Sequence, residues 1–270
     1  MAVTKVEGAR QRGMSTVGPD PDHIFYPALA ILISATGFAG FAFTYFGPII
    51  GGSYPRAGAP LHVHGWSFFL WYLLFPLQAV LVAKGKHAQH RTLGLISVAL
   101  VVLMTVTGVL VLTVRVEEAV RNGAPQVWLL YGPLFLSNLI LFVAFYTAAI
   151  YMAMRSRFQA HKRLIIVASA AGLAAGFSRV IMFLTGFHPV SIPAGALSCG
   201  LFIIIGMSYD WFTRRAVHPV YWTGITALLV VEISVLPQVN GDAVAWINQW
   251  LAAIGDHLGI LYQPHPTVEF

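Results

Sequence analysis

Seven apolar segments, each long enough to cross a lipid bilayer as a helix, constrain this chain more than any other feature. A helix needs about 20 mostly apolar residues to span the hydrocarbon core of a bilayer. The segments are Ala28–Phe46, Gly65–Val82, Leu93–Val114, Val127–Met154, Leu164–Thr185, Val190–Tyr209 and Val220–Leu236. They predict an all-α integral membrane bundle of seven transmembrane helices.

The scarcity of charge supports a membrane location. Of the 270 residues, 57% are hydrophobic and only 10% are charged. A soluble domain carries about 25% charged residues, because its surface must face water. We therefore expect most of the outer surface to face lipid, so that the bilayer is the first partner of this protein.

The distribution of Lys and Arg predicts an orientation. With the N-terminus in the cytoplasm, 12 basic residues fall on the cytoplasmic side and 3 on the outer side. The cytoplasmic set is Lys5, Arg10, Arg12, Lys84, Lys86, Arg91, Arg155, Arg157, Lys162, Arg163, Arg214 and Arg215, and the outer set is Arg56, Arg115 and Arg121. The positive-inside rule then predicts a multi-pass protein of the inner (plasma) membrane, with its C-terminus outside.

Three regions follow from this topology. Residues 1–26 form a polar cytoplasmic tail, residues 27–238 form the seven-helix transmembrane domain, and residues 239–270 form an outer-face tail. Within the last region, Asp242 is a candidate N-cap, and apolar residues recur at helical spacing through Ala243–Leu258. With Trp246 and Trp250 among them, this segment predicts an amphipathic helix at the outer interface.

Two charged residues lie well inside the predicted spans, Arg179 and Glu232. Because an unpaired charge in a bilayer is costly, such residues face the protein interior and find partners. Counting back from the predicted outer ends of their helices places both roughly 6–9 Å below the outer surface. Equal depth predicts a buried Arg179–Glu232 pair. The pair has two interpretations, a structural contact that fixes helix packing or part of a polar cavity open to the outside.

The outer-side histidines suggest a second candidate site. His62 and His64 lie at the start of the second span, and His188 lies between the fifth and sixth spans. In extended backbone, His62 and His64 face the same side and can bind one metal ion, whereas in a helix they point roughly 200° apart. The alternatives are a metal site, a haem near this surface held by His64, or histidines that only make hydrogen bonds.

The cytoplasmic side carries a third candidate site. His87 and His90 share one face of a helical turn, and His161 opens the fifth span. Three imidazoles suit iron, zinc or copper. The alternative is a basic belt in which these histidines, together with Lys and Arg, meet lipid headgroups.

Several functional classes are not indicated. The chain has no Gly-rich phosphate loop, no Gly-x-Ser-x-Gly nucleophile elbow and no nucleic-acid-binding module. Its one cysteine, Cys199, leaves no intramolecular disulfide. Neither an enzymatic reaction nor a particular cofactor is specified by these residues.

A set of short motifs gives the chain a family likeness. These are His62-x-His64-Gly65, His90-Arg91-x-Leu93-Gly94, His161-Lys162-Arg163-Leu164, Arg179, and Tyr209-Asp210 with His218-Pro219-Val220-Tyr221. From about His62 to Tyr221, the chain resembles a family of uncharacterised bacterial multi-pass inner-membrane proteins. The resemblance implies the architecture and the location, and it implies no reaction.

Three functional hypotheses follow. The first is membrane redox or metal chemistry at a His, Arg and Glu site in the outer half, with metal or haem as the cofactor. The second is a non-catalytic accessory or scaffold subunit of a larger membrane complex, with other membrane subunits as partners. The third is a small-solute transporter, because transporter sites lie at broken helices near the membrane midplane.

Overall fold

The computed structural model describes residues 20–54, 57–123, 126–186, 188, 190–235 and 241–259. Within these residues the protein is helical and has no strand, which confirms the all-α prediction. The helices are α1 (Asp22–Phe41), the π-helical segment η1 (Ala42–Phe46), α2 (Gly47–Ile50), α3 (Ala59–Ala83), α4 (His87–Asn122), α5 (Gln126–Met154), α6 (Phe158–Ala171), α7 (Ala174–Leu184), α8 (Ser191–Ser198), α9 (Gly200–Arg214), α10 (Pro219–Val235) and α11 (Asp242–Leu258).

Five stretches of the described chain are long and apolar enough to cross a membrane. They are Asp22–Ile50, Ala59–Ala83, His87–Asn122, Val127–Met154 and Ser191–Arg214. The bent pair of α6 and α7 makes a sixth if it counts as one span, and Pro219–Ser234 in α10 is a shorter apolar helix. The structure thus supports a helical membrane protein with five or six such spans.

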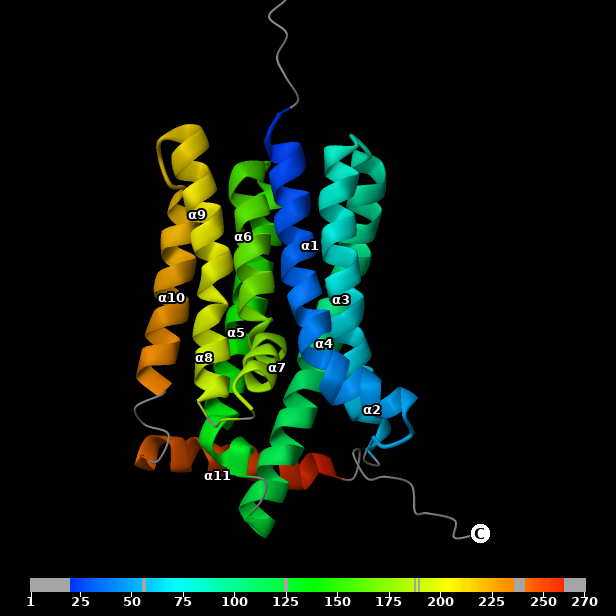
Figure 1. Ribbon diagram of the computed structural model, residues 1–270, viewed down its shortest axis with the longest axis vertical. Coiled ribbons are helices and arrows are strands. Elements are labelled where there is room, and N and C mark those ends of the chain that lie inside the picture. Colours follow the sequence, from blue (N-terminus) through cyan, green and yellow to red (C-terminus); the bar gives the residue numbers. More distant parts are fainter. Residues whose placement is uncertain are drawn as a thin grey trace, which may run out of the picture.

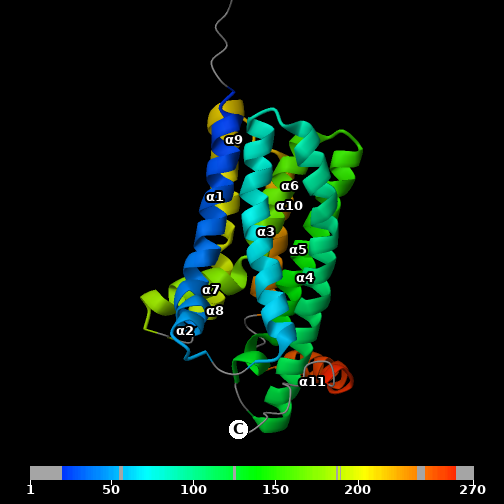
Figure 2. The ribbon, with the colours of Figure 1, turned by 90° about the vertical axis from the view of Figure 1, so that its right-hand side faces the viewer.

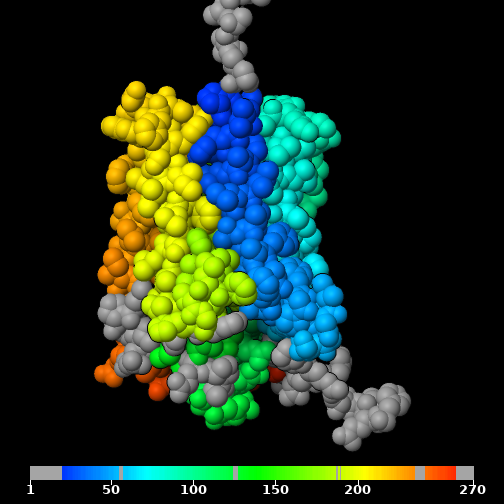
Figure 3. Space-filling model, in the orientation of Figure 1, coloured from blue at the N-terminus to red at the C-terminus, as the bar shows by residue number. Residues whose placement is uncertain are grey.

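The surface of the bundle is apolar, as a lipid-facing surface must be. Large hydrophobic side chains are exposed along the outward faces of α1 and α3, where Leu73 is 58% exposed. A soluble monomer rarely exposes a continuous apolar surface of this extent. Figure 3 shows α1 in blue running down this face between α9 in yellow and α3 in cyan.

The helices run up and down between two ends of the bundle (Figures 1 and 2). The end at which α1 begins also holds the starts of α4, α6 and α10 and the ends of α3, α5 and α9. We call it the basic end, because the described basic residues at its helix junctions are Lys84, Lys86, Arg91, Arg155, Arg157, Lys162, Arg163, Arg214 and Arg215. The opposite end carries α11, and the half of the bundle next to it is called the distal half.

Three helices are interrupted in the distal half or at mid-height. The α-helix of α1 passes into the π-helical η1 after Phe41. A bend of 49° separates α6 from α7, and α8 gives way to α9 at Cys199. The predicted span Leu164–Thr185 therefore corresponds to a bent pair of helices instead of one continuous helix. The bend directs α7 sideways across the bundle, where it meets the short helix α8 (Figure 2).

Small residues allow these interrupted helices to pack closely. A Cβ atom on Gly40 of α1 would collide with the carbonyl oxygen of Gly176 on α7. A Cβ atom on Gly195 of α8 would collide with the backbone of Ser178 on α7. Small residues let membrane helices approach each other at the backbone, which replaces the hydrophobic driving force that lipid does not supply.

The predicted amphipathic helix forms as α11 and lies across the distal end, roughly at right angles to the bundle (Figure 1). Its buried face includes Val244 and Leu251, and Leu251 packs in one apolar cluster with Leu112 of α4. The Asn248 side-chain amide donates to the Leu129 carbonyl oxygen at 2.6 Å. Its Trp246 is 67% exposed. A position at a membrane interface suits that exposed tryptophan and stays a prediction.

Candidate functional site

The outer-side histidines do not converge, because they lie on a helix. His62 and His64 both belong to the first turns of α3, so residues two apart point roughly 200° away from each other. The His62 Nδ1 atom is 2.9 Å from the Tyr45 hydroxyl, whereas the His64 Nδ1 atom is 3.5 Å from Thr107 Oγ1 on α4. In this helix the two imidazoles cannot bind one metal ion together, so the shared site predicted for extended backbone is wrong.

His188 has a local structural role instead. Its Nδ1 atom accepts a hydrogen bond from the Val190 backbone N–H at 3.2 Å. Its carbonyl oxygen accepts one from the Ser191 hydroxyl at 2.7 Å, at the start of α8. In the part of the chain that the structure describes, three or more His, Cys, Asp or Glu side chains nowhere gather into a group that could hold a metal ion.

Arg179 and Glu232 make separate contacts. The Arg179 guanidinium donates to the Ala175 carbonyl oxygen at 2.8 Å and lies 4.4 Å from the centre of the Phe41 ring. No ion pair joins it to Glu232 among the described residues. Equal depth was inferred by counting along straight helices, and the bend before α7 invalidates that count.

Glu232 instead lies in a buried polar group at the centre of the distal half. Its side chain, on α10, is 0% exposed. Its Oε1 atom accepts a long hydrogen bond of 3.4 Å from the Asn138 side-chain amide of α5, and Asn138 also donates to the Leu134 carbonyl. Glu232 Oε2 and Asn138 Oδ1 are shielded from solvent and have no hydrogen-bond partner in the described structure. Two oxygens that can accept a hydrogen bond or a cation are thus left over, and the carboxyl oxygen of Glu232 can also take up a proton.

The helices that carry this pair of oxygens pack against interrupted helices. Helix α10 lies against α6 and against both α8 and α9, which meet at the buried Cys199. The buried Tyr72 hydroxyl donates to the Ser169 carbonyl oxygen at 3.1 Å, in the last turn of α6 before the bend. We call Glu232, Asn138, Cys199, Tyr72 and Ser169 the central polar group.

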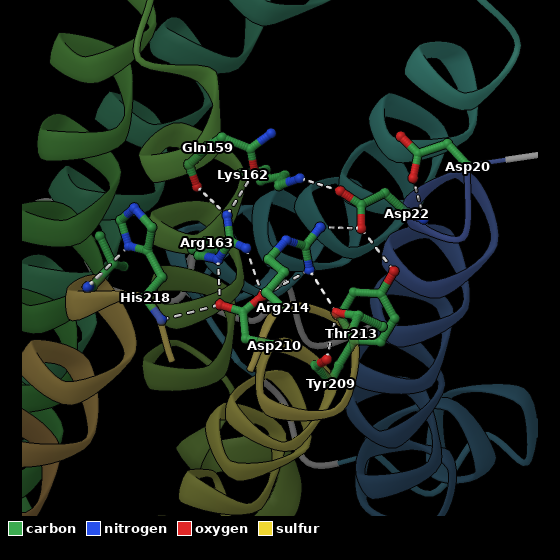
Figure 4. Close-up of polar contacts among 11 residues, drawn as sticks. Asp20, Asp22, Gln159, Lys162, Arg163, Tyr209, Asp210, Thr213, Arg214 and His218 are labelled. Atoms are coloured by element: carbon green, nitrogen blue, oxygen red, sulfur yellow. Dashed lines mark hydrogen bonds and ion pairs between the residues drawn. The ribbon is translucent and has the colours of Figure 1, made fainter. Parts of the chain in front are cut away.

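A second polar group lies at the basic end, where its charged side chains are hydrogen-bonded to one another (Figure 4). Arg163 of α6 is 1% exposed, and Asp210 of α9 is 0% exposed. The Arg163 Nε atom donates to Asp210 Oδ2 at 2.8 Å, and Nη2 donates to Oδ1 at 2.5 Å. The remaining Nη1 atom donates to the Gln159 side-chain oxygen at 2.9 Å. Every nitrogen of this buried guanidinium therefore has a partner.

The same network reaches α1 and the start of α10. Arg214 of α9 donates to Asp210 Oδ1 at 3.0 Å and to Asp22 Oδ1 at 2.5 Å. Asp22 also accepts from the Tyr209 hydroxyl at 2.7 Å and from Lys162. The His218 backbone N–H donates to Asp210 Oδ2 at 3.2 Å. Four helices are thereby tied together at this end. We call this set the basic-end network: Asp22, Gln159, Lys162, Arg163, Tyr209, Asp210, Arg214 and His218.

An open pocket of about 330 Å³ lies beside the basic-end network. Gln159, Arg163, Asp210, Arg214 and His218 are among its lining residues. The guanidinium groups already donate to Asp210, Gln159 and Asp22, so the pocket presents neutralised charge instead of free cations.

Of the three histidines expected at the basic end, two come together. The rings of His90 on α4 and His161 on α6 have centroids 6.2 Å apart and planes at 80°. The third, His87, is exposed and is not part of that ring pair. The predicted three-histidine arrangement is therefore corrected to a pair.

The basic-end network was not foreseen as a site. Arg163, Lys162 and Arg214 had been interpreted as orientation signals on the cytoplasmic side. Asp210 had entered only as part of a motif of family likeness, and Asp22 had not been singled out. A signal was present, because Asp210 and Arg163 are opposite charges at helix ends that the topology places on one side of the membrane. Their burial required α6 and α9 to pack side by side.

No known family model matches the sequence, and neither a curated protein nor a solved structure is detectably similar to the chain.

Proposed function

We propose that this protein is an inner-membrane transporter that couples the movement of a small solute to protons at Glu232. The proposal includes seven spans, with α6–α7 and α10 among them, and the basic end in the cytoplasm. The observation that carries it is the buried Glu232–Asn138 pair, whose oxygens without partners belong to helices that pack against the interrupted helices α6–α7 and α8–α9.

Broken helices give transporters their binding sites, because an interrupted helix leaves backbone polar groups free within the membrane. Here Tyr72 donates to Ser169 just before the α6–α7 bend, and α10, which carries Glu232, packs against both α8 and α9. A single carboxyl in apolar surroundings costs least when it holds a proton or another cation. Glu232 can therefore take up a cation and release it when the surrounding helices move.

In the proposed transport cycle, the basic-end network closes one side of the solute site. It joins α1, α6, α9 and α10 through charged hydrogen bonds. A transporter must close one side of its site while the other side is open. In this proposal the network is the closed inner gate, and its opening separates Asp22 from Arg214.

The decisive experiment uses purified protein in liposomes that contain a pH-sensitive dye. A membrane potential is imposed, pools of amino acids, sugars, organic acids and inorganic ions are added outside, and internal pH is followed. We expect wild-type protein to acidify the interior with one of these pools, and Glu232→Gln to abolish the response. Asp256→Asn, an exposed carboxyl of α11, is the matched control and should retain it. Equal flux in wild-type and Glu232→Gln liposomes, or no wild-type flux with any pool, rejects the proposal.

Membrane redox chemistry is a second candidate, favoured by the His90–His161 ring pair. Ultraviolet–visible spectra and metal analysis of the purified protein test it, since a bound haem gives an intense absorption band. Absence of both a haem band and stoichiometric metal rejects it. Membership of the uncharacterised bacterial family and the role of an accessory subunit stay predictions from the sequence.

A further inference from the structure

Two histidines from different helices meet just inside the basic end, away from the basic-end network. His90 is in the first turn of α4, and His161 is in the first turn of α6. Their ring centroids are 6.2 Å apart, and their planes are nearly perpendicular at 80°. Both rings are partly shielded from solvent. The fold therefore brings together two imidazoles that lie more than 70 residues apart in the sequence.

The hydrogen bond made by His161 leaves its other nitrogen available. Its Nδ1 atom is 2.9 Å from the Ala149 carbonyl oxygen of α5. A carbonyl oxygen only accepts hydrogen bonds, so Nδ1 carries the proton and Nε2 carries a lone pair. Metal-binding histidines are oriented in this way, with the second ring nitrogen donating to a backbone carbonyl.

Two further acceptors on the neighbouring helices have no partner. His90 Nδ1 and Gln78 Oε1 are shielded from solvent without a hydrogen-bond partner in the described residues. Gln78 is on α3, and the nitrogen of its side-chain amide is 3.8 Å from the position of a Cβ atom on Gly94, one turn after His90. The backbone carbonyl of Gln78 interacts with the His90 imidazole. Buried acceptors without partners call for an occupant, an ordered water or an ion, and a bound cation would satisfy both of these at once.

The spacing of the rings suits one shared metal ion. An imidazole nitrogen binds zinc or a similar ion at about 2.0–2.1 Å, and the ring centre lies about 1.1 Å beyond that nitrogen. Two rings that bind one ion from opposite sides have centroids about 6.3 Å apart, so the observed centroid distance of 6.2 Å leaves room for an ion when one nitrogen of each ring faces it. A tetrahedral ion would need the rings to approach by about 1 Å. Near-linear coordination by two ligands is typical of Cu(I), and imidazole is among the ligands that copper accepts.

We propose that His90 and His161 bind a single Cu(I) ion between α4 and α6, with Gln78 beside it as a supporting oxygen. Both histidines bind as neutral imidazoles, and no electron transfer is required. The site ties the first turns of α4 and α6 together where they meet α3 and α5. The inference is independent of the proposed transport function, because it concerns different residues at the other end of the bundle.

The test is copper retention by the purified protein in lipid nanodiscs. The protein is incubated anaerobically with Cu(I), excess metal is removed by gel filtration, and copper per chain is measured by mass spectrometry. We expect about one copper per wild-type chain, and at least a tenfold loss in His90→Gln, His161→Gln and the double variant. His87→Gln, an exposed histidine one turn away, is the matched control and should retain copper.

X-ray absorption separates this site from copper held elsewhere on the chain. The spectrum of the wild-type complex should show two imidazole ligands, and it should be unchanged in His87→Gln. Each variant is checked for a monodisperse elution profile. The Gln78→Leu variant keeps both histidines, so it tests the contribution of the Gln78 oxygen to copper retention without removing an imidazole. Wild-type protein without stoichiometric copper, or a double variant that retains as much copper as wild type, overturns the proposal.

Discussion

The two buried polar groups of this protein differ in how completely their hydrogen bonds are made. In the basic-end network, Arg163 and Asp210 are fully buried, and each nitrogen of the guanidinium donates to an oxygen. In the central polar group, Glu232 is equally buried, but its one hydrogen bond is long and its Oε2 atom has no partner within the described chain.

The difference separates a group that stabilises one closed arrangement of the helices from a group that is free to bind. A buried charge whose hydrogen bonds are satisfied stabilises the arrangement that satisfies them, and removing its partner is strongly unfavourable. A buried carboxyl with a free oxygen contributes little to stability as it stands, so its position has to be explained by something that binds. We therefore expect mutations in the basic-end network to affect folding, and mutations of Glu232 to affect activity.

The largest expected effect comes from breaking the buried ion pair. Arg163→Met should lower the free energy of unfolding by about 3–5 kcal/mol, because Asp210 is left buried without its main partner. Unfolding of the purified protein in detergent measures this loss. The double variant Arg163→Met/Asp210→Leu should recover part of it, because neither charge is then left alone. An unchanged unfolding midpoint in Arg163→Met would show that the network is not structural.

The next largest effect is expected in the distal half, where close contacts between small residues hold the helices together without paired charges. Gly40→Leu places a side chain against the backbone of Gly176, so α1 and α7 must separate. Overpacking of this kind costs about 1–3 kcal/mol in the free energy of unfolding. Thermal unfolding in detergent reports it. Gly65→Ala is the control, because its Cβ atom would have no neighbour nearer than 3.9 Å, and it should unfold like wild type.

A smaller effect on stability is expected from Glu232→Gln. The amide has the same shape, and its nitrogen can donate to the unpartnered Asn138 Oδ1 atom, so the free energy of unfolding should change by less than about 1 kcal/mol. The same detergent unfolding experiment measures it. A loss as large as that of Arg163→Met would contradict the division between the two groups, because Glu232 would then be structural.

The smallest effect is a pH dependence at the edge of the network. Burial lowers the pKa of His218 below its usual value near 6.5, and the nearby positive charges of Arg163 and Lys162 act in the same direction, against the opposing charge of Asp210. The unfolded chain then binds more protons than the folded one, so this contribution is fully present above pH 6.5. It is lost as the pH falls below 6.5 toward the folded pKa. His218→Gln should make the unfolding midpoint depend less steeply on pH over that window. A pH dependence as steep as that of wild type would contradict the assignment.

Helix formation and placement within the chain were largely predictable. Each apolar segment has only itself to satisfy its backbone hydrogen bonds in lipid, so local sequence is sufficient to specify a helix. The amphipathic spacing around Val244 and Leu251 likewise identified α11. The alternation of basic residues placed the helix junctions that now lie together at the basic end.

The sites were not predictable from local spacing alone. His62 and His64 could share a metal ion only in extended backbone, and the structure places both in a helix, where they point apart. Arg179 and Glu232 were expected to pair, but the bend of 49° between α6 and α7 removes the straight helix on which that expectation depended. The bend falls at Gly172 and Leu173, where a Cβ atom on Gly172 would lie 3.1 Å from the Phe142 ring of α5, a contact between helices that local sequence does not report.

By itself, the sequence determined that this chain is a helical membrane protein with its basic residues gathered at one end, because apolar length and charge are properties of single segments. Only the tertiary structure decided which buried charges are paired. Arg163 with Asp210, His90 with His161, and Glu232 with Asn138 each join different helices. Such pairs depend on the rotation, tilt and interruption of both helices, and these are set by packing between segments.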